Sequence, residues 1–155
     1  MTLVSIAAAL VVFVLGLLAA LHFYWGVGGR WPGHDDRSLV EYVVGRSRDM
    51  RAPNFWACLF VTAALLTTAV LVALYAGLLV LPLPAWLRWL VQAGYWGAFA
   101  VFAARGIAGY IPSVFRYAEG TPFARLNQLY YSPLCLAIAA GFVIIHLSAK
   151  LPQPS

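Results

Sequence analysis

The sequence predicts an all-α integral membrane protein: a bundle of four transmembrane helices with short interfacial helices in the first and third loops. Hydrophobic residues make up 63% of the chain, charged residues only 10%, and the mean hydropathy is +0.84. Soluble domains average about 45–50% apolar and about 25% charged residues, so this chain has too few charges to cover a water-exposed surface. The charges also fall in the gaps between apolar runs. We therefore expect one transmembrane domain over residues 1–155.

Four apolar runs are long enough to cross a bilayer, whose hydrocarbon core of ~30 Å needs about 20 helical residues. Pro82 and Pro84 separate the second run from the third, because proline interrupts a helix. Pro133 stands in the first turn of the fourth run, where its missing N–H is tolerated. The predicted spans cover residues 3–25, 55–81, 85–104 and 132–149.

The third run is the least apolar, because Arg88 and Gln92 lie within its first two turns. Trp86 and Trp89 flank the arginine, and tryptophan is common at the membrane–water interface. We expect the Arg88 side chain to extend along the helix to this interface, so that its charge stays in water.

Basic residues are distributed unequally between the two sides that four spans create. Loop 1 (residues 26–54) and loop 3 (residues 105–131) lie on the same side, and the other side holds only Arg88 and Lys150. Basic residues favour the cytoplasmic side of short loops. We therefore expect loops 1 and 3 in the cytoplasm and both termini in the periplasm of a bacterial inner membrane. The loop arginines are Arg30, Arg37, Arg46, Arg48, Arg51, Arg105, Arg116 and Arg125.

Each of the two long loops contains the start signal of a helix. In loop 1, the sequence from Ser38 to Glu41 has the spacing of a capping box and is followed by apolar residues, which predicts a short helix lying on the membrane. In loop 3, Thr121 and Pro122 provide a cap and a first-turn proline. A second short helix should run from there to Tyr131 and continue into the fourth span.

Several classes of function are disfavoured by the composition. The net charge of +5 is explained by topology, and no basic stripe with interleaved aromatic residues predicts nucleic-acid binding. Cys58 and Cys135 have no CxxC spacing, so a metal site formed by them with His22 is a weak signal. His22 and His146 lie near opposite ends of their helices, too far apart to clamp one haem. We predict no cofactor.

Polar chemistry concentrates at the cytoplasmic edge of the predicted spans, whereas the opposite edge is expected to be chemically plain. His22 lies within one turn of the end of the first span and Arg105 closes the third. His22 is either a neutral imidazole that bonds a neighbouring helix or a ligand-binding or proton-transfer group. Arg105 binds a lipid phosphate, an internal carboxylate such as Glu41 or Glu119, or an anionic ligand.

The residues at this edge form two motifs that resemble a known family. The first is the run HFYWGVGGRWP over residues 22–32, and the second comprises RGIAGY, FR, PFARLN and LYYSPLC between residues 105 and 135. Together they resemble the small bacterial four-span proteins catalogued as domain of unknown function three-nine-nine-five. The resemblance implies an acidic residue where Asn127 stands. If that acid carries a proton or partners Arg125 in the relatives, this chain lacks the role.

Two functional hypotheses follow. The first is a bundle that binds or acts on a small hydrophobic or lipid-like molecule in a pocket at the cytoplasmic face. The second is a structural or accessory subunit of a homo-oligomer or a larger membrane complex, favoured by small residues such as Gly16, Gly94 and Gly97 that let helices approach closely. A transporter would need an oligomer. The candidate ligand-binding residues are His22, Trp25, Trp31, Arg105, Tyr110, Arg125, Asn127 and Tyr131.

Overall fold

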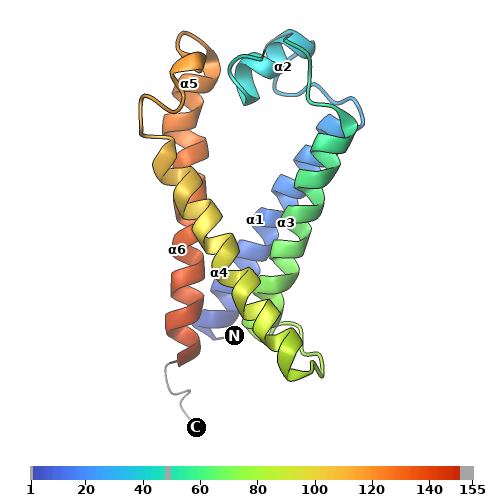
Figure 1. Cartoon of the computed structure of the whole chain (residues 1–155), viewed down its shortest axis with the longest axis vertical. Helices are drawn as coiled ribbons and strands as arrows, with labels where there is room; N and C mark the ends of the chain where they lie inside the picture. Colours follow the sequence, from blue (N-terminus) through green and yellow to red (C-terminus); the bar gives the residue numbers. More distant parts are fainter. Residues whose placement is uncertain (1, 48–49, 151–155) are drawn as a thin grey trace.

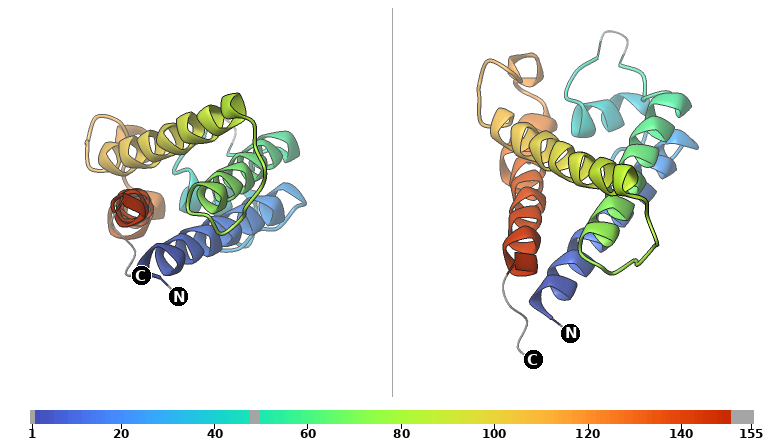
Figure 2. Two further views of the ribbon diagram at one scale, coloured as in Figure 1. Left: turned by 90° about the horizontal axis from the view of Figure 1, so that it is seen from below. Right: turned by 60° about the horizontal axis from the view of Figure 1, so that its bottom comes forward.

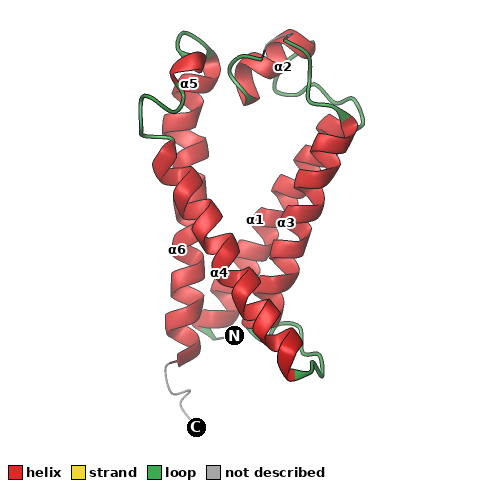
Figure 3. Cartoon of the chain, in the orientation of Figure 1, coloured by secondary structure: helices red, strands yellow, loops and turns green. Residues whose placement is uncertain are grey.

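The computed structural model describes residues 2–47 and 50–150, and Arg48 lies outside them. The fold is all-α, and the described part contains no strand (Figure 3). Four long helices, α1, α3, α4 and α6, are joined by connections that contain the short helices α2 and α5. Their bounds are α1 Leu3–Gly26, α2 Asp36–Val43, α3 Phe55–Tyr75, α4 Ala85–Ala108, α5 Pro122–Leu126 and α6 Ser132–Lys150.

The long helices run alternately in opposite directions between the same two ends of the molecule (Figure 1). Each packs against two others, because α1 contacts α3 and α6, while α4 contacts the same two helices. The α1–α3 pair and the α4–α6 pair diverge toward the end that carries α2 and α5 (Figures 1 and 2). We call this the wide end, and we call the opposite end, with the α3–α4 connection, the narrow end.

Three helical segments are long and apolar enough to cross a membrane: Leu3–Gly26, Phe55–Tyr75 and Pro122–Ala149. They indicate a membrane protein. Helix α4 is not among them, because Arg88, Gln92 and Arg105 lower its apolar character. Its 24 residues nevertheless span about 36 Å, which is sufficient for a bilayer core. The fourth span therefore stays a prediction.

The predicted second span is longer than the helix that forms. Helix α3 ends at Tyr75, and Gly77 then adopts φ +72°, a left-handed conformation that suits glycine. The backbone N–H of Leu79 donates to the carbonyl oxygen of Ala73, which folds the chain back on the helix end. Residues 78–81 are apolar, so hydropathy alone extended the predicted span beyond the turn. Helix α4 conversely continues to Ala108, four residues past the predicted end.

Helix α2 is capped by a different residue from the one predicted. The helix begins at Asp36, and Asp35 is its N-cap, so the capping box joins Asp35 to Ser38 rather than Ser38 to Glu41. The Ser38 hydroxyl and backbone N–H both donate to the Asp35 carboxylate at 2.7 Å. These bonds favour the ionised form and hold the pKa of Asp35 below its ordinary value. The predicted position of α2 at a membrane surface stays a prediction.

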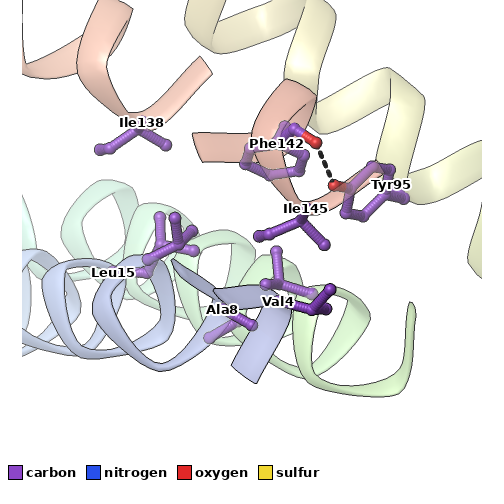
Figure 4. Packing of buried hydrophobic residues seen from close by; sticks show 10 residues of the cluster. Val4, Ala8, Leu15, Tyr95, Ile138, Phe142 and Ile145 are labelled. Atoms are coloured by element: carbon purple, nitrogen blue, oxygen red, sulfur yellow. Dashed lines mark hydrogen bonds between the residues drawn. The ribbon is translucent and has the colours of Figure 1, made fainter. Parts of the chain in front are cut away.

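The buried core lies toward the narrow end and joins all four long helices. Tyr95 of α4 is its largest fully buried side chain, and its hydroxyl donates to the carbonyl oxygen of Phe142 in α6 at 2.6 Å (Figure 4). Phe142 and Ile145 of α6 belong to the same buried cluster as Leu15 of α1 (Figure 4). A buried hydroxyl without a partner would be costly, so this bond allows a tyrosine to fill the core.

An aromatic cluster extends this core to α3. The Tyr75 ring stacks on Tyr95 with centroids 3.8 Å apart, and the Tyr75 hydroxyl lies 2.6 Å from Nδ1 of His146. Trp96 meets the same imidazole edge to face at 4.9 Å. The expectation that this edge of the bundle is chemically plain is therefore wrong. The side chains that meet there come from α3, α4 and α6, and hydropathy does not report which polar groups will pair.

We predict that Tyr95→Phe destabilises the bundle without changing its fold. The substitution keeps the ring and its stacking but removes the donor to the Phe142 carbonyl, which should cost about 1 kcal/mol. Thermal unfolding in a mild detergent measures the effect. Tyr130→Phe is the matched control, because Tyr130 is exposed. Equal unfolding temperatures for the two variants would contradict the assigned role of the Tyr95 bond.

Candidate functional site

The wide end contains the candidate residues, and the structure distributes them over two regions. Arg105, Tyr110, Asn127 and Tyr131 belong to the α4–α6 side, in or next to α4, α5 and the π-helical turn Asn127–Tyr131. His22, Trp25 and Trp31 belong to the α1–α3 side. Arg125 is exposed on α5. The candidate residues therefore occupy two local environments.

Arg105 and Asn127 form the polar centre of the α4–α6 side. The Arg105 guanidinium donates through Nη2 to Oδ1 of Asn127 at 2.7 Å, and its Nη1 is buried with no partner among the described residues. The face of the guanidinium lies 4.9 Å from the centre of the Phe115 ring. A neutral amide thus stands where a carboxylate would balance the arginine charge. Among the described residues, the charge is stabilised by hydrogen bonding and by an aromatic ring, and no ion pair to it is formed.

Asn127 is 1% exposed and uses both ends of its amide. Its Oδ1 also accepts from the Ser132 hydroxyl at 3.3 Å, and its Nδ2 donates to the carbonyl oxygen of Gly109 at 3.2 Å. The end of α4 can approach this amide closely because Gly109 has no side chain. A Cβ at this position would overlap the Ser132 hydroxyl. Asn127 therefore joins α4 to the start of α6.

Neither internal carboxylate proposed for Arg105 is its partner among the described residues. Glu41 accepts from Arg37 one helical turn away, at 3.4 Å. The carbonyl oxygen of Glu119 accepts from Arg46 at 3.2 Å, and no ion pair joins Glu119 to Arg105 in the described part of the chain. Arg125 is also not the partner of Asn127, because the amide oxygen is directed to Arg105. The guanidinium at the centre of this polar site is therefore that of Arg105.

The two sides of the wide end are bridged by the loops. The Tyr131 hydroxyl donates to the carbonyl oxygen of Tyr42 in α2 at 3.1 Å, and α2 packs against α5. Leu39 and Val40 of α2 are fully buried. Tyr110 contributes only locally, since its hydroxyl donates to the Gln128 carbonyl at 3.2 Å on an exposed surface. Helix α2 therefore contributes its own packing core at this end, beside the diverging long helices.

His22 lies beside a small, almost entirely apolar cavity of about 190 Å³. Its Nδ1 is 2.8 Å from the carbonyl oxygen of Leu18, one turn earlier in α1. A carbonyl oxygen only accepts, so the neutral ring carries its proton on Nδ1 and Nε2 is an acceptor. This bond lies within α1, not to the neighbouring helix that one reading of the sequence proposed. The other lining residues are Trp25, Val43, Val44, Pro53, Ala57, Cys58 and Val61.

Trp25 and Trp31 fix the chain at the exit of α1. The Trp25 ring meets His22 edge to face at 5.0 Å, and its indole N–H donates to the carbonyl oxygen of Trp31 at 2.6 Å. The Trp31 side chain itself is exposed. Trp25 therefore positions the His22 ring, whereas Trp31 contributes its backbone.

The cysteines do not assemble a metal centre with His22. Cys58 lines the His22 cavity from α3, whereas Cys135 lies in α6, and both are free thiols. Within residues 2–47 and 50–150, no group of three His, Cys, Asp or Glu side chains is placed to hold a metal ion.

A second polar region was missed by sequence reasoning and lies at the narrow end. Tyr75, Arg88 and Gln92 line a cavity of about 400 Å³ beneath the α3–α4 connection. One signal was available in the sequence: Arg88, Gln92 and Tyr95 follow the spacing i, i+4, i+7 and so share one face of α4. Hydropathy did not reveal that α3 ends before its apolar run does.

The family model for proteins of unknown function DUF3995 matches residues 13–142. The chain belongs to this family. No curated protein and no solved structure matches it. The matched segment contains Arg105, Asn127 and the His22 cavity, together with Tyr95 and the part of its core that lies within these residues. The family has no established function, so a function for this chain has to be argued from the geometry of these sites.

We predict that Asn127→Ala is more destabilising than Asn127→Asp. The alanine leaves the partly buried guanidinium, the Ser132 hydroxyl and the Gly109 carbonyl without their partner, at a cost of roughly 2–4 kcal/mol. The aspartate still accepts from Arg105 and Ser132 and loses only the donor to Gly109. Thermal unfolding in detergent at neutral pH measures the order. An aspartate variant as unstable as the alanine variant would show that the Arg105 bond contributes little.

Proposed function

We propose that this protein crosses the bacterial inner membrane four times and binds a small lipid-like molecule at its cytoplasmic face. Helix α4 supports the fourth crossing, because it runs between the same two ends as the three apolar candidate spans (Figure 1). Among the described residues, the wide end contains six loop arginines, whereas the narrow end contains Arg88 and Lys150. This bias favours a cytoplasmic wide end, with both termini in the periplasm. The six are Arg30, Arg37, Arg46, Arg51, Arg116 and Arg125.

The observation that carries the binding proposal is the His22 cavity. It is lined by α1, α2 and α3 together with Pro53, and its walls are mostly apolar. Nε2 of the lining residue His22 makes no hydrogen bond within the described part of the chain. Ligand sites are commonly apolar with a few polar groups that fix orientation. An acceptor nitrogen selects a hydrogen-bond donor, so the favoured ligand is an amphiphile with a hydroxyl group.

The size of the cavity defines which part of such a ligand it accommodates. Its volume of about 190 Å³ is below the range of about 300–1,000 Å³ that holds a whole drug-sized molecule. The cavity therefore receives the hydroxyl-bearing end, while the hydrocarbon chain follows the apolar surface of α1 and α3 into the bilayer. Helix α2 covers the end of the cavity through Val43 and Val44.

We predict that His22→Phe abolishes selective binding of a hydroxyl lipid. Phenylalanine keeps the aromatic volume and the contact with Trp25 but removes the acceptor. Native mass spectrometry compares retention of monoolein with that of methyl oleate, which has the same chain and no hydroxyl. The wild type should retain monoolein about tenfold better, as expected for one hydrogen bond of about 1.4 kcal/mol. His34→Phe, on an exposed loop residue, is the control. Unchanged monoolein retention in His22→Phe would refute the proposal.

A second candidate function, a subunit of a homo-oligomer, is favoured by two glycines. A Cβ at Gly94 would meet Leu71, and one at Gly141 would meet Val11, so these glycines serve internal packing. A Cβ at Gly16 or Gly97 would meet nothing within 4 Å. Small residues that internal packing does not need allow a helix of another chain to approach.

We predict that the oligomer, if it forms through these positions, dissociates in Gly97→Leu. A leucine side chain would hold a neighbouring helix away from α4 while leaving the monomer intact, because the space inside the chain is open there. Native mass spectrometry in mild detergent reports the stoichiometry. Ala64→Leu, on an exposed position of α3, is the matched control. A wild type that is strictly monomeric without partners would refute this candidate.

A further inference from the structure

We propose that the narrow end holds a second binding site, for an amphiphile with an oxyanion head group. The site is the cavity of about 400 Å³ beneath the α3–α4 connection, which is distinct from the His22 cavity in position and in chemistry. Its polar lining residues are Arg88, Gln92 and Tyr75, and the rest of its wall is aliphatic. Its volume falls within the range typical of ligand sites.

Arg88 lies on the same face of α4 as the core residue Tyr95. At 100° per residue, Arg88 lies seven residues, or about two turns, before Tyr95, which is buried in the core. Gln92 lies on the same face, one turn after Arg88. Trp86 and Trp89, which are 65% and 67% exposed, lie about 160° and about 100° around the helix from Arg88. Arg88 therefore shares the face of α4 that carries Tyr95, and it lines the cavity. The expected extension of its side chain to the membrane interface stays a prediction.

No acidic side chain of the described residues lies at the narrow end to balance the charge of Arg88. Asp35, Asp36, Glu41 and Glu119 all belong to the segments that form the wide end. Residues 50–118 contain no acidic residue, and no ion pair involves Arg88 in the described ranges. Arg88 and Gln92 are both exposed, so their N–H groups are accessible to a ligand. A guanidinium beside an amide donor recognises the two oxygens of a carboxylate or a phosphate.

The walls of the cavity match the hydrocarbon part of such a ligand. Leu79, Val80, Leu81 and Leu83 from the connection line it, and Val80 is 83% exposed. An exposed apolar segment next to an unpaired cation is the pattern that an anionic amphiphile complements. Tyr75 forms a rigid wall, because its ring is stacked on Tyr95 and its hydroxyl is engaged with His146. The head group thus lies at Arg88 and Gln92, with the chain against the aliphatic residues.

Tryptophan quenching by brominated lipids tests this assignment, since Trp86, Trp89 and Trp96 all lie on α4. The detergent-solubilised protein is titrated with dibromostearate and with methyl dibromostearate, a neutral counterpart that has no hydroxyl group. We expect the acid to bind about tenfold more tightly than the methyl ester, because only the acid makes a charge-assisted bond to Arg88. Equal quenching by the two probes, or none by the acid, would overturn the proposal.

Variants test whether dibromostearate binds at this cavity. Arg88→Gln should weaken dibromostearate binding about tenfold. Arg88→Lys, which keeps the charge but loses the bidentate geometry, should weaken it less than Arg88→Gln. Arg116→Gln, on an exposed arginine at the wide end, should leave it unchanged. If Arg88→Gln does not fold, Gln92→Leu keeps the charge, removes the amide donor and should weaken binding a few-fold. Unchanged dibromostearate affinity in folded Arg88→Gln would overturn the proposed site. If that variant does not fold, unchanged affinity in Gln92→Leu would overturn it.

Competition distinguishes the possible sources of the oxyanion. Displacement of the probe by phosphatidylglycerol but not by phosphatidylcholine supports a phospholipid head group, and displacement by unlabelled stearate alone supports a free carboxylate. Complete displacement by inorganic phosphate would show a site for a soluble anion and would overturn the amphiphile assignment. Because His22 and monoolein play no part in these measurements, their outcome is independent of the function proposed for the wide end.

Discussion

The buried core around Tyr95 is the constraint on which the rest of this structure depends. It is the place where all four long helices meet, and its central polar group is satisfied by a carbonyl oxygen of the opposite helix. Because the helices are held together there, they can diverge toward the other end without separating (Figure 1). The loops then complete the wide end with contacts of their own, such as the bond from Tyr131 to Tyr42.

The polar side chains at the packed end and at the loop-built end are held in different ways. At the narrow end, polar side chains come from the helices themselves: Tyr75 is engaged with His146, whereas Arg88 and Gln92 line the cavity. At the wide end, Arg105 depends on Asn127, which stands in the π-helical turn before α6, and His22 depends on its own helix. Arg105 and His22 are thus each oriented by a hydrogen-bond partner.

The long helices and the two loop helices could be predicted from the sequence, because hydropathy and helix-start signals are local. The end of α3 could not, since Leu78 to Leu81 continue the apolar run although Gly77 turns the chain. The candidate residues were correctly assigned to one end of the bundle, but their partners were not. Asn127 pairs with Arg105 across 22 positions, and such pairing depends on how helices cross, which single-residue patterns do not encode. The same reason explains why the Tyr75–His146 bond was missed.

The π-helical turn Asn127–Tyr131 gives the last third of the chain a property that an uninterrupted α-helix would lack. A wider turn contains more than 3.6 residues, so it changes the rotational phase between the segments before and after it by up to about 100° per extra residue. Helix α5 can thereby direct the buried Phe123 toward the α2 side while α6 presents Ser132 to α4, within one continuous rod. Removing a single residue from this turn would leave both segments helical and yet misalign every contact on one side of it.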